Sequence, residues 1–114
     1  MRTLTAALAL IIGSSVGAQT VIDQSAEGIP QSALLSATAA LAKELADPRS
    51  LQLRNLRYAP PLRTVCGEFN ARGTGGGYEP FRQFVTTPDV TIIVPPPGEF
   101  LHSYHQNEAN RLCP

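Results

Sequence analysis

The chain has 114 residues, of which 43% are hydrophobic and 16% are charged. It is long enough for one globular domain, and its composition argues against a disordered chain. Nine basic and nine acidic side chains give a formal net charge of zero, which excludes a strongly electrostatic nucleic-acid binder. No motif in the sequence dictates a reaction, a metal or a cofactor.

Residues 1–18 have the order of parts of a secretory signal peptide. Arg2 supplies a positive charge, residues 4–13 form an apolar stretch, and Val16-Gly17-Ala18 ends the segment in small residues. Ten apolar residues rise only about 15 Å as a helix, against a membrane core of roughly 30 Å, so the sequence predicts no membrane span. We therefore expect cleavage after Ala18 and a periplasmic or secreted protein.

The two cysteines, Cys66 and Cys113, are expected to form a disulfide, because an exported chain meets an oxidising compartment. The C-x-x-C spacing of a redox pair is absent. A zinc site in which His102 and His105 join Cys113 stays the alternative. A disulfide that closes a loop of roughly 50 residues would stabilise the domain by about 4 kcal/mol.

Residues 19–31 are polar and show no sustained period, so they are predicted to form a flexible arm before a single domain of residues 32–114. From Ser32, a candidate N-cap, apolar residues recur at intervals of three and four up to Leu45 in an alanine-rich segment. This pattern predicts a helix that ends before Pro48. Its apolar stripe comprises Leu34, Leu35, Thr38, Leu41, Ala42 and Leu45.

Four segments read as strands: residues 51–58, 64–71, 78–85 and 90–94. In the first, the apolar alternation slips at Asn55, which predicts a β-bulge. In the second, the alternation places Cys66 and Phe69 on opposite faces. The glycine-rich residues 73–77 fit a hairpin tip better than a phosphate-binding loop, because they lie between strands and no lysine follows.

Pro95-Pro96-Pro97 ends strand pairing, and residues 99–112 show a weak helical pattern that a bond to Cys113 would dock. The predicted fold is therefore α+β. It has an N-terminal helix packed on a three- to four-stranded antiparallel sheet and a short C-terminal helix tied by the disulfide.

Three segments of the middle of the chain read DPRSLQLRN, VCGEFNA and GGYEPFRQF. They resemble an uncharacterised family of small exported proteobacterial proteins with the pattern DP-x-S-x-x-F-R-N, V-C-G-E-V-N-A and G-G-Y-x-G-F-R-x-F. Leu53, Phe69 and Pro80 depart from that pattern. The resemblance implies no activity. Its residues suggest a scaffold in which Asn55, Asn70 and Tyr78 satisfy backbone groups and Arg54 bridges to Glu68.

The leading functional hypothesis is a non-enzymatic, exported domain that binds a protein or associates with the cell envelope. The hairpin from Glu68 to Arg82 is its expected recognition surface, with Asn70, Arg72, Tyr78 and Arg82 as exposed contacts.

Two alternatives come from other classes of protein. A small hydrolase would use His102 or His105 with Glu68 or Ser103, and it requires a pocket that brings the C-terminal helix to Glu68. An inhibitor of a secreted enzyme would insert Pro95-Pro96-Pro97 or the glycine tip as a wedge.

Overall fold

The computed structural model describes residues 20–114, so the predicted leader and its cleavage site lie outside the described residues. Five strands form one sheet in the order β1-β2-β3-β4-β5, in which β1 runs parallel to β2 and the other neighbours are antiparallel. The predicted α+β fold is confirmed, with β1 as an additional, two-residue strand. The elements are β1 (Thr20–Val21), η1 (Ser25–Gly28), α2 (Gln31–Ala42), η2 (Pro48–Ser50), β2 (Gln52–Ala59), η3 (Pro60–Leu62), β3 (Thr64–Asn70), β4 (Arg82–Thr86), β5 (Thr91–Ile93) and α3 (His102–Leu112).

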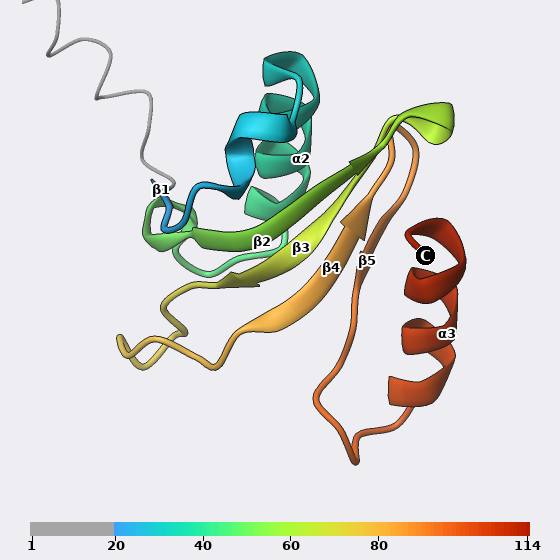
Figure 1. Cartoon of the computed structure of the whole chain (residues 1–114). Coiled ribbons are helices and arrows are strands. Elements are labelled where there is room, and N and C mark those ends of the chain that lie inside the picture. Colours follow the sequence, from blue (N-terminus) through green and yellow to red (C-terminus); the bar gives the residue numbers. More distant parts are fainter. Residues whose placement is uncertain (1–19) are drawn as a thin grey trace, which may run out of the picture.

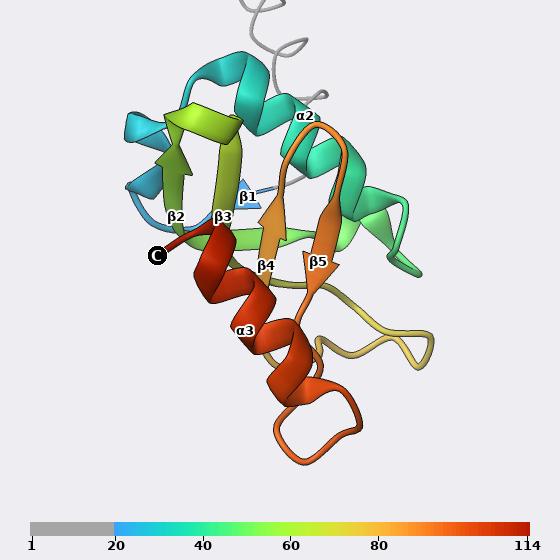
Figure 2. The ribbon, with the colours of Figure 1, turned by 90° about the vertical axis from the view of Figure 1, so that its right-hand side faces the viewer.

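The two long helices cover opposite faces of the sheet, as Figures 1 and 2 show. Alternate residues of β3 face alternate helices, and Cys66 and Phe69 fall in different clusters, as predicted. The core beneath α2 contains Ile29, Ala33, Ala37, Leu41, Leu51, Leu53, Leu56, Val65, Phe69 and Phe84. The smaller cluster beneath α3 contains Cys66, Val85, Ile92, Val94, Ala109 and Cys113.

Helix α2 is where predicted, but its ends and its buried stripe differ from the prediction. It begins at Gln31 with Pro30 as N-cap, so Ser32 is not the cap, and it stops at Ala42. Its buried residues are Ala33, Ala37, Thr38 and Leu41, while Leu35 is 53% exposed. Leu35 lies two positions from both Ala33 and Ala37, so helical periodicity places it on the face opposite the buried stripe.

The predicted bulge is confirmed at Asn55, which has a φ of 54°. The register of β2 against β3 shifts between Arg54 and Arg57, so that Asn55 and Leu56 together oppose Gly67. A Cβ on Gly67 would lie 2.8 Å from Leu56 Cδ2 and 3.0 Å from the Arg54 carbonyl oxygen. Glycine is therefore required opposite the bulge by close approach of the partner strand.

The segment predicted to be a flexible arm has regular structure from Thr20 onward and ties down the bulge. Asp23 Oδ2 accepts a hydrogen bond from the Asn55 amide at 2.8 Å, and Ser25 Oγ accepts one from the Leu56 amide at 2.9 Å. The Ser25 hydroxyl also donates to Asp23 Oδ1 at 2.6 Å. Together with the Asn55 and Ser25 amides, that hydroxyl holds the pKa of Asp23 below its usual value. These side chains supply partners for backbone groups that the bulge leaves unpaired.

Helix α3 lies against β4 and β5, and the predicted disulfide joins Cys113 at its end to Cys66 in β3, with 6.5 Å between the Cα atoms. The sequence pattern predicts a helix from residue 99, but the helix begins at His102, and Phe100 and Leu101 are exposed. Ala109 is its one buried residue. Among the described residues, no helix has the length and apolar character needed to cross a membrane.

Candidate functional site

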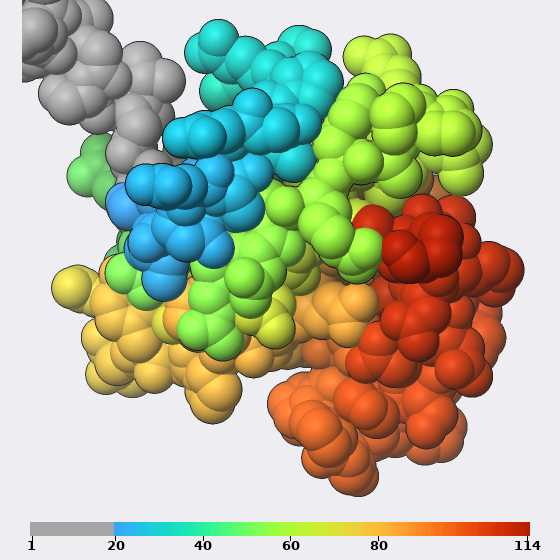
Figure 3. Space-filling model, viewed as in Figure 1, coloured from blue at the N-terminus to red at the C-terminus, as the bar shows by residue number. Residues whose placement is uncertain are grey.

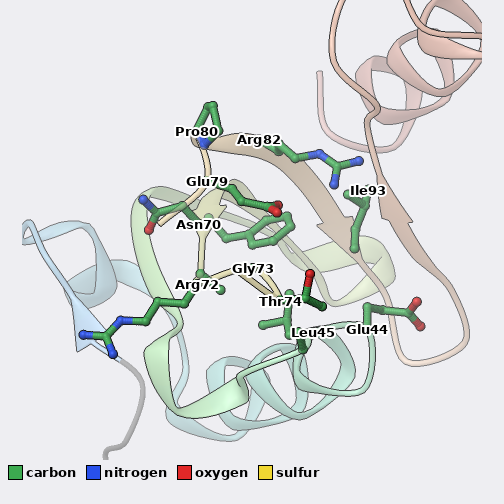
Figure 4. Close-up of a pocket in the computed structure, with 13 residues that line it drawn as sticks. Glu44, Leu45, Asn70, Arg72, Gly73, Thr74, Glu79, Pro80, Arg82 and Ile93 are labelled. Atoms are coloured by element: carbon green, nitrogen blue, oxygen red, sulfur yellow. The ribbon is translucent and has the colours of Figure 1, made fainter. Parts of the chain in front are cut away.

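A pocket of about 240 Å³ lies between the end of α2 and the hairpin loop, residues 71–81, that joins β3 to β4. We call it the loop pocket; Figure 4 shows it with its lining side chains. Phe69, Leu45 and Ile93 provide apolar walls, and Arg72, Arg82, Glu44 and Glu79 provide charges of both signs. The remaining lining residues are Ala46, Asn70, Ala71, Gly73, Thr74 and Pro80.

Two segments form the sides of this pocket: the turn after α2 and the base of the hairpin loop. After Ala42, the Glu44 and Leu45 amides donate to the Leu41 and Ala42 carbonyls in tightened turns, which brings residues 44–46 to the pocket. On the other side, the buried Ser50 hydroxyl accepts a hydrogen bond from the Arg72 amide at 2.7 Å. Ser50 thus fixes the base of the hairpin loop beside the helix end.

The hairpin loop is closed by its own backbone. The Gly73 amide donates to the Gly77 carbonyl at 2.9 Å, and the Glu79 amide donates to the Ala71 carbonyl at 3.0 Å. A Cβ on Gly73 would lie 3.1 Å from Glu79 Cδ, so a side chain at position 73 would displace the Glu79 carboxylate. The glycine tip therefore sets the position of a charged group of the pocket as well as the turn.

The charges of the loop pocket are not neutralised by one another. Within residues 20–114, none of Glu44, Glu79, Arg72 and Arg82 takes part in a salt bridge. In Figure 4, Glu79 and Thr74 turn toward the middle, while Arg72 and Glu44 extend outward on opposite sides. Arg82 Nε donates to the Val94 carbonyl at 3.2 Å, which leaves its terminal amino groups available. The pocket can therefore pair with a ligand that carries both signs of charge.

The four residues predicted for binding do meet in one region, but not as four exposed contacts. Asn70, Arg72 and Arg82 line the loop pocket, whereas Tyr78 does not line it and is 47% exposed, with the Arg72 guanidinium 5.4 Å from its ring centre. The prediction that Asn70 is exposed is wrong: it is 8% exposed, because it ends β3 beneath the loop. Its Oδ1 is buried and accepts no hydrogen bond from the described part of the chain.

Sequence reasoning missed Glu44, Leu45 and Glu79 as lining residues. Glu44 and Leu45 belong to the turn after α2, which is far in sequence from the hairpin loop. No local sequence pattern predicts that this turn and the hairpin loop lie side by side. Glu79 carried a signal, because it is a carboxylate inside the loop proposed for recognition. A carboxylate among strand arginines is equally typical of cross-strand pairing, so the signal alone does not assign Glu79 to a pocket.

The residues considered for hydrolysis are not brought together. His102 Nδ1 donates to the Pro95 carbonyl at 2.7 Å, and His105 lies 3.5 Å from the Glu108 carboxylate. Glu68 instead accepts from Arg54 Nε at 2.7 Å, as the scaffold interpretation predicted, and from Asn55 Nδ2 at 3.0 Å. The hollow beside Glu68 is lined by Asn55, Arg57, Gly67 and Gln83, with no contribution from α3.

Among residues 20–114, no group of three or more His, Cys, Asp or Glu side chains is placed to hold a metal ion. Cys113 belongs to the disulfide, so it is not available as the zinc ligand that the alternative interpretation required. The disulfide is consistent with an oxidising, extracytoplasmic location.

Comparison of the chain with protein-family models, with curated protein sequences and with solved structures finds no match. The resemblance to a family of small exported proteins therefore stays a prediction.

Proposed function

We propose that this protein is an exported, non-enzymatic binding domain, periplasmic or secreted, and that it recognises a protein or envelope partner through the hairpin loop. The observation that carries the proposal is the loop pocket, which gathers two arginines and two glutamates beside an apolar wall, with no salt bridge to any of them from the described residues. The leader-like residues 1–18 and the disulfide support export.

The geometry favours a polar partner segment with mixed charge over an extended apolar one. The exposed Tyr78 ring pairs with the guanidinium of Arg72, which lines the pocket, and this pair suits stacking with a planar group. Inside the pocket, Glu79 and the terminal amino groups of Arg82 offer an acceptor and donors, while Phe69 limits depth. A side chain of the partner that enters the pocket would pair with one of these charges and exclude water from it.

The proposal is tested by affinity capture from an envelope extract of the producing cell with the immobilised, oxidised protein. The variant Tyr78→Ala with Arg82→Ala removes an exposed aromatic ring and a guanidinium from the recognition surface. Its matched control, Leu35→Ala with Arg111→Ala, removes a large exposed side chain from α2 and an exposed arginine from α3, both outside the loop pocket. We expect capture to be lost in the first variant and retained in the second.

Loss of the Arg82 bond to the Val94 carbonyl would cost about 1 kcal/mol of stability, so both variants should be compared well below their unfolding temperature. Equal recovery of the captured partner by both variants would contradict the proposed surface. Turnover of a substrate that requires His102 or His105 would contradict the non-enzymatic part.

One observation favours the alternative function, inhibition of a secreted enzyme by insertion of the Pro95-Pro96-Pro97 segment. That segment leads to Phe100, whose side chain is 88% exposed.

A further inference from the structure

The connection between β5 and α3 displays a cluster of exposed apolar side chains. Phe100 has the highest exposed fraction of the large apolar side chains in residues 20–114, and Leu101 and Tyr104 beside it are 45% and 57% exposed. We call these three residues the apolar knob. Figures 1, 2 and 3 show that the segment that carries it projects from one end of the molecule. Phe100 belongs to neither buried cluster, and its exposure together with Leu101 and Tyr104 makes it a candidate contact residue.

The knob is held in place by the backbone around it. The Glu99 amide donates to the Pro96 carbonyl and the His102 amide donates to the Glu99 carbonyl, each at 3.1 Å. The His102 ring bonds the Pro95 carbonyl at 2.7 Å and so closes the base of the loop. Leu101 has a φ of 71°, a left-handed conformation that is unfavourable for leucine. The exposed ring is therefore presented by an ordered turn, which lowers the entropy cost of docking it.

A mainly apolar hollow of about 570 Å³ lies near the other end of α3. Arg57 is its one charged side chain among the described residues, and Ile29, Leu56 and Tyr58 contribute apolar surface. The other lining residues are Ser25, Gly28, Ala59, Pro60, Cys113 and Pro114. We call this the β2 hollow, since it follows the second half of that strand.

The knob cannot fill the β2 hollow of its own chain. The knob lies at the start of α3, and Cys113 at the end of α3 lines the hollow. A helix of 11 residues separates them, which corresponds to about 16 Å. Any contact between the two features must therefore join different molecules.

We propose that the apolar knob of one copy docks into the β2 hollow of a second copy. The hollow has room for an aromatic ring and a neighbouring aliphatic side chain. The charges also match. Glu99 precedes Phe100 in the knob segment, and the hollow carries the Arg57 guanidinium, which stays positively charged while its Nη1 and Nη2 donate to the Pro114 and Cys113 carbonyls. An anionic membrane is a poorer fit, because residues 95–101 contain one acidic and no basic side chain.

The proposed contact is heterologous, since knob and hollow are different surfaces. Each copy would use its knob on one neighbour and its hollow on another, which gives head-to-tail association. One ring and its neighbours bury less area than a standard protein interface, so the dissociation constant is expected to be about 0.1 mM. Such weak association would matter where the protein is concentrated, as on a surface.

Sedimentation velocity of the oxidised protein, from about 1 µM to about 1 mM, tests this directly. The weight-average mass should rise with concentration. Phe100→Ser removes the knob, and Gly28→Leu fills the hollow, where a Cβ meets nothing within 4 Å. Each variant alone should associate at least tenfold more weakly. The control Leu35→Ser removes another exposed apolar side chain and should associate like the unmodified protein.

Mixing the two defective variants gives the decisive result. The Gly28→Leu copy keeps its knob and the Phe100→Ser copy keeps its hollow, so an equimolar mixture should form a dimer and nothing larger. A monomer at every concentration of the unmodified protein would overturn the proposal, including when Phe100 binds vesicles or another protein. Association that survives Gly28→Leu but not Phe100→Ser would overturn it too, because it would indicate contact between two knobs.

Discussion

The two faces of the sheet are stabilised in different ways. Beneath α2, ten buried residues form a continuous core, and Asp23 and Ser25 fasten the neighbouring bulge by hydrogen bonds. Beneath α3, the cluster has six members, and two of them are the cysteines of the disulfide. The α2 face is thus stabilised by packing, whereas α3 depends on a covalent bond.

This difference assigns the two proposed surfaces to different parts of the molecule. The loop pocket is built on β3 and the end of α2, the side with the larger core. The apolar knob and one wall of the β2 hollow belong to α3 and its flanks. Loss of the disulfide should therefore impair self-association before it impairs recognition through the hairpin loop.

The largest effect is expected for removal of the disulfide by Cys66→Ser with Cys113→Ser. Because the bond closes a long loop, its loss should lower the free energy of unfolding by about 4 kcal/mol in urea denaturation. Leu41→Ala is the counterpart on the other face and should cost a similar amount, about 3 kcal/mol, through a cavity beneath α2. A cysteine variant as stable as the parent would contradict the dependence of the α3 face on the disulfide.

An intermediate effect is expected for Gly67→Ala at the bulge. The new methyl group would meet Leu56 and the Arg54 carbonyl at contact distances too short to keep, so the free energy of unfolding should fall by about 2 kcal/mol. Gly28→Ala is the control, because its Cβ has open space, and it should change stability by under about 0.5 kcal/mol. Equal stability of the two alanine variants would show that the bulge does not constrain position 67.

The smallest effect is expected for Asp23→Asn, which keeps the shape of the side chain but replaces Oδ2 by a donor that opposes the Asn55 amide. The pKa of Asp23 is lowered in the folded chain, so its carboxylate stabilises fully above the unfolded pKa of about 3.9. This contribution is lost as the pH falls through the lower, folded pKa. Urea unfolding should thus show the variant less stable at pH 7 and equal to the parent in acid.

Asp89→Asn is the control for that measurement, since the Asp89 side chain makes no hydrogen bond within the described residues. A pH-independent loss of stability in Asp23→Asn would mean that shape rather than charge matters at the bulge.

Patterns within one segment predicted the fold well. The parity slip at Asn55 predicted the bulge because each strand position selects a face, and the alternation around Cys66 placed the disulfide on the α3 side. The prediction of the apolar stripe of α2 was partly wrong. The leucines suggested a broad apolar face, whereas the buried face consists largely of alanines. Hydrophobic spacing cannot tell how closely a helix approaches its sheet.

Apart from the Cys66–Cys113 disulfide and the Arg54–Glu68 bridge, features that depend on distant residues were not predicted. Asp23 and Ser25 bond backbone amides more than 30 positions away, and the loop pocket needs the end of α2 beside the hairpin loop. The weak helical pattern includes Phe100, yet the helix starts two residues later and leaves its side chain exposed. Such contacts follow from tertiary packing, which a single sequence does not display.

Amide hydrogen exchange of the Cys66→Ser, Cys113→Ser variant tests the contrast between the two faces most directly. Helix α3 has one buried residue, and an isolated helix of its length is marginal in water. We predict that residues 102–112 exchange like an unfolded peptide in this variant, while α2, β2 and β3 stay protected, with their protection reduced only by the loss of global stability. Continued protection of α3, or loss of protection in α2 together with α3, would contradict the account.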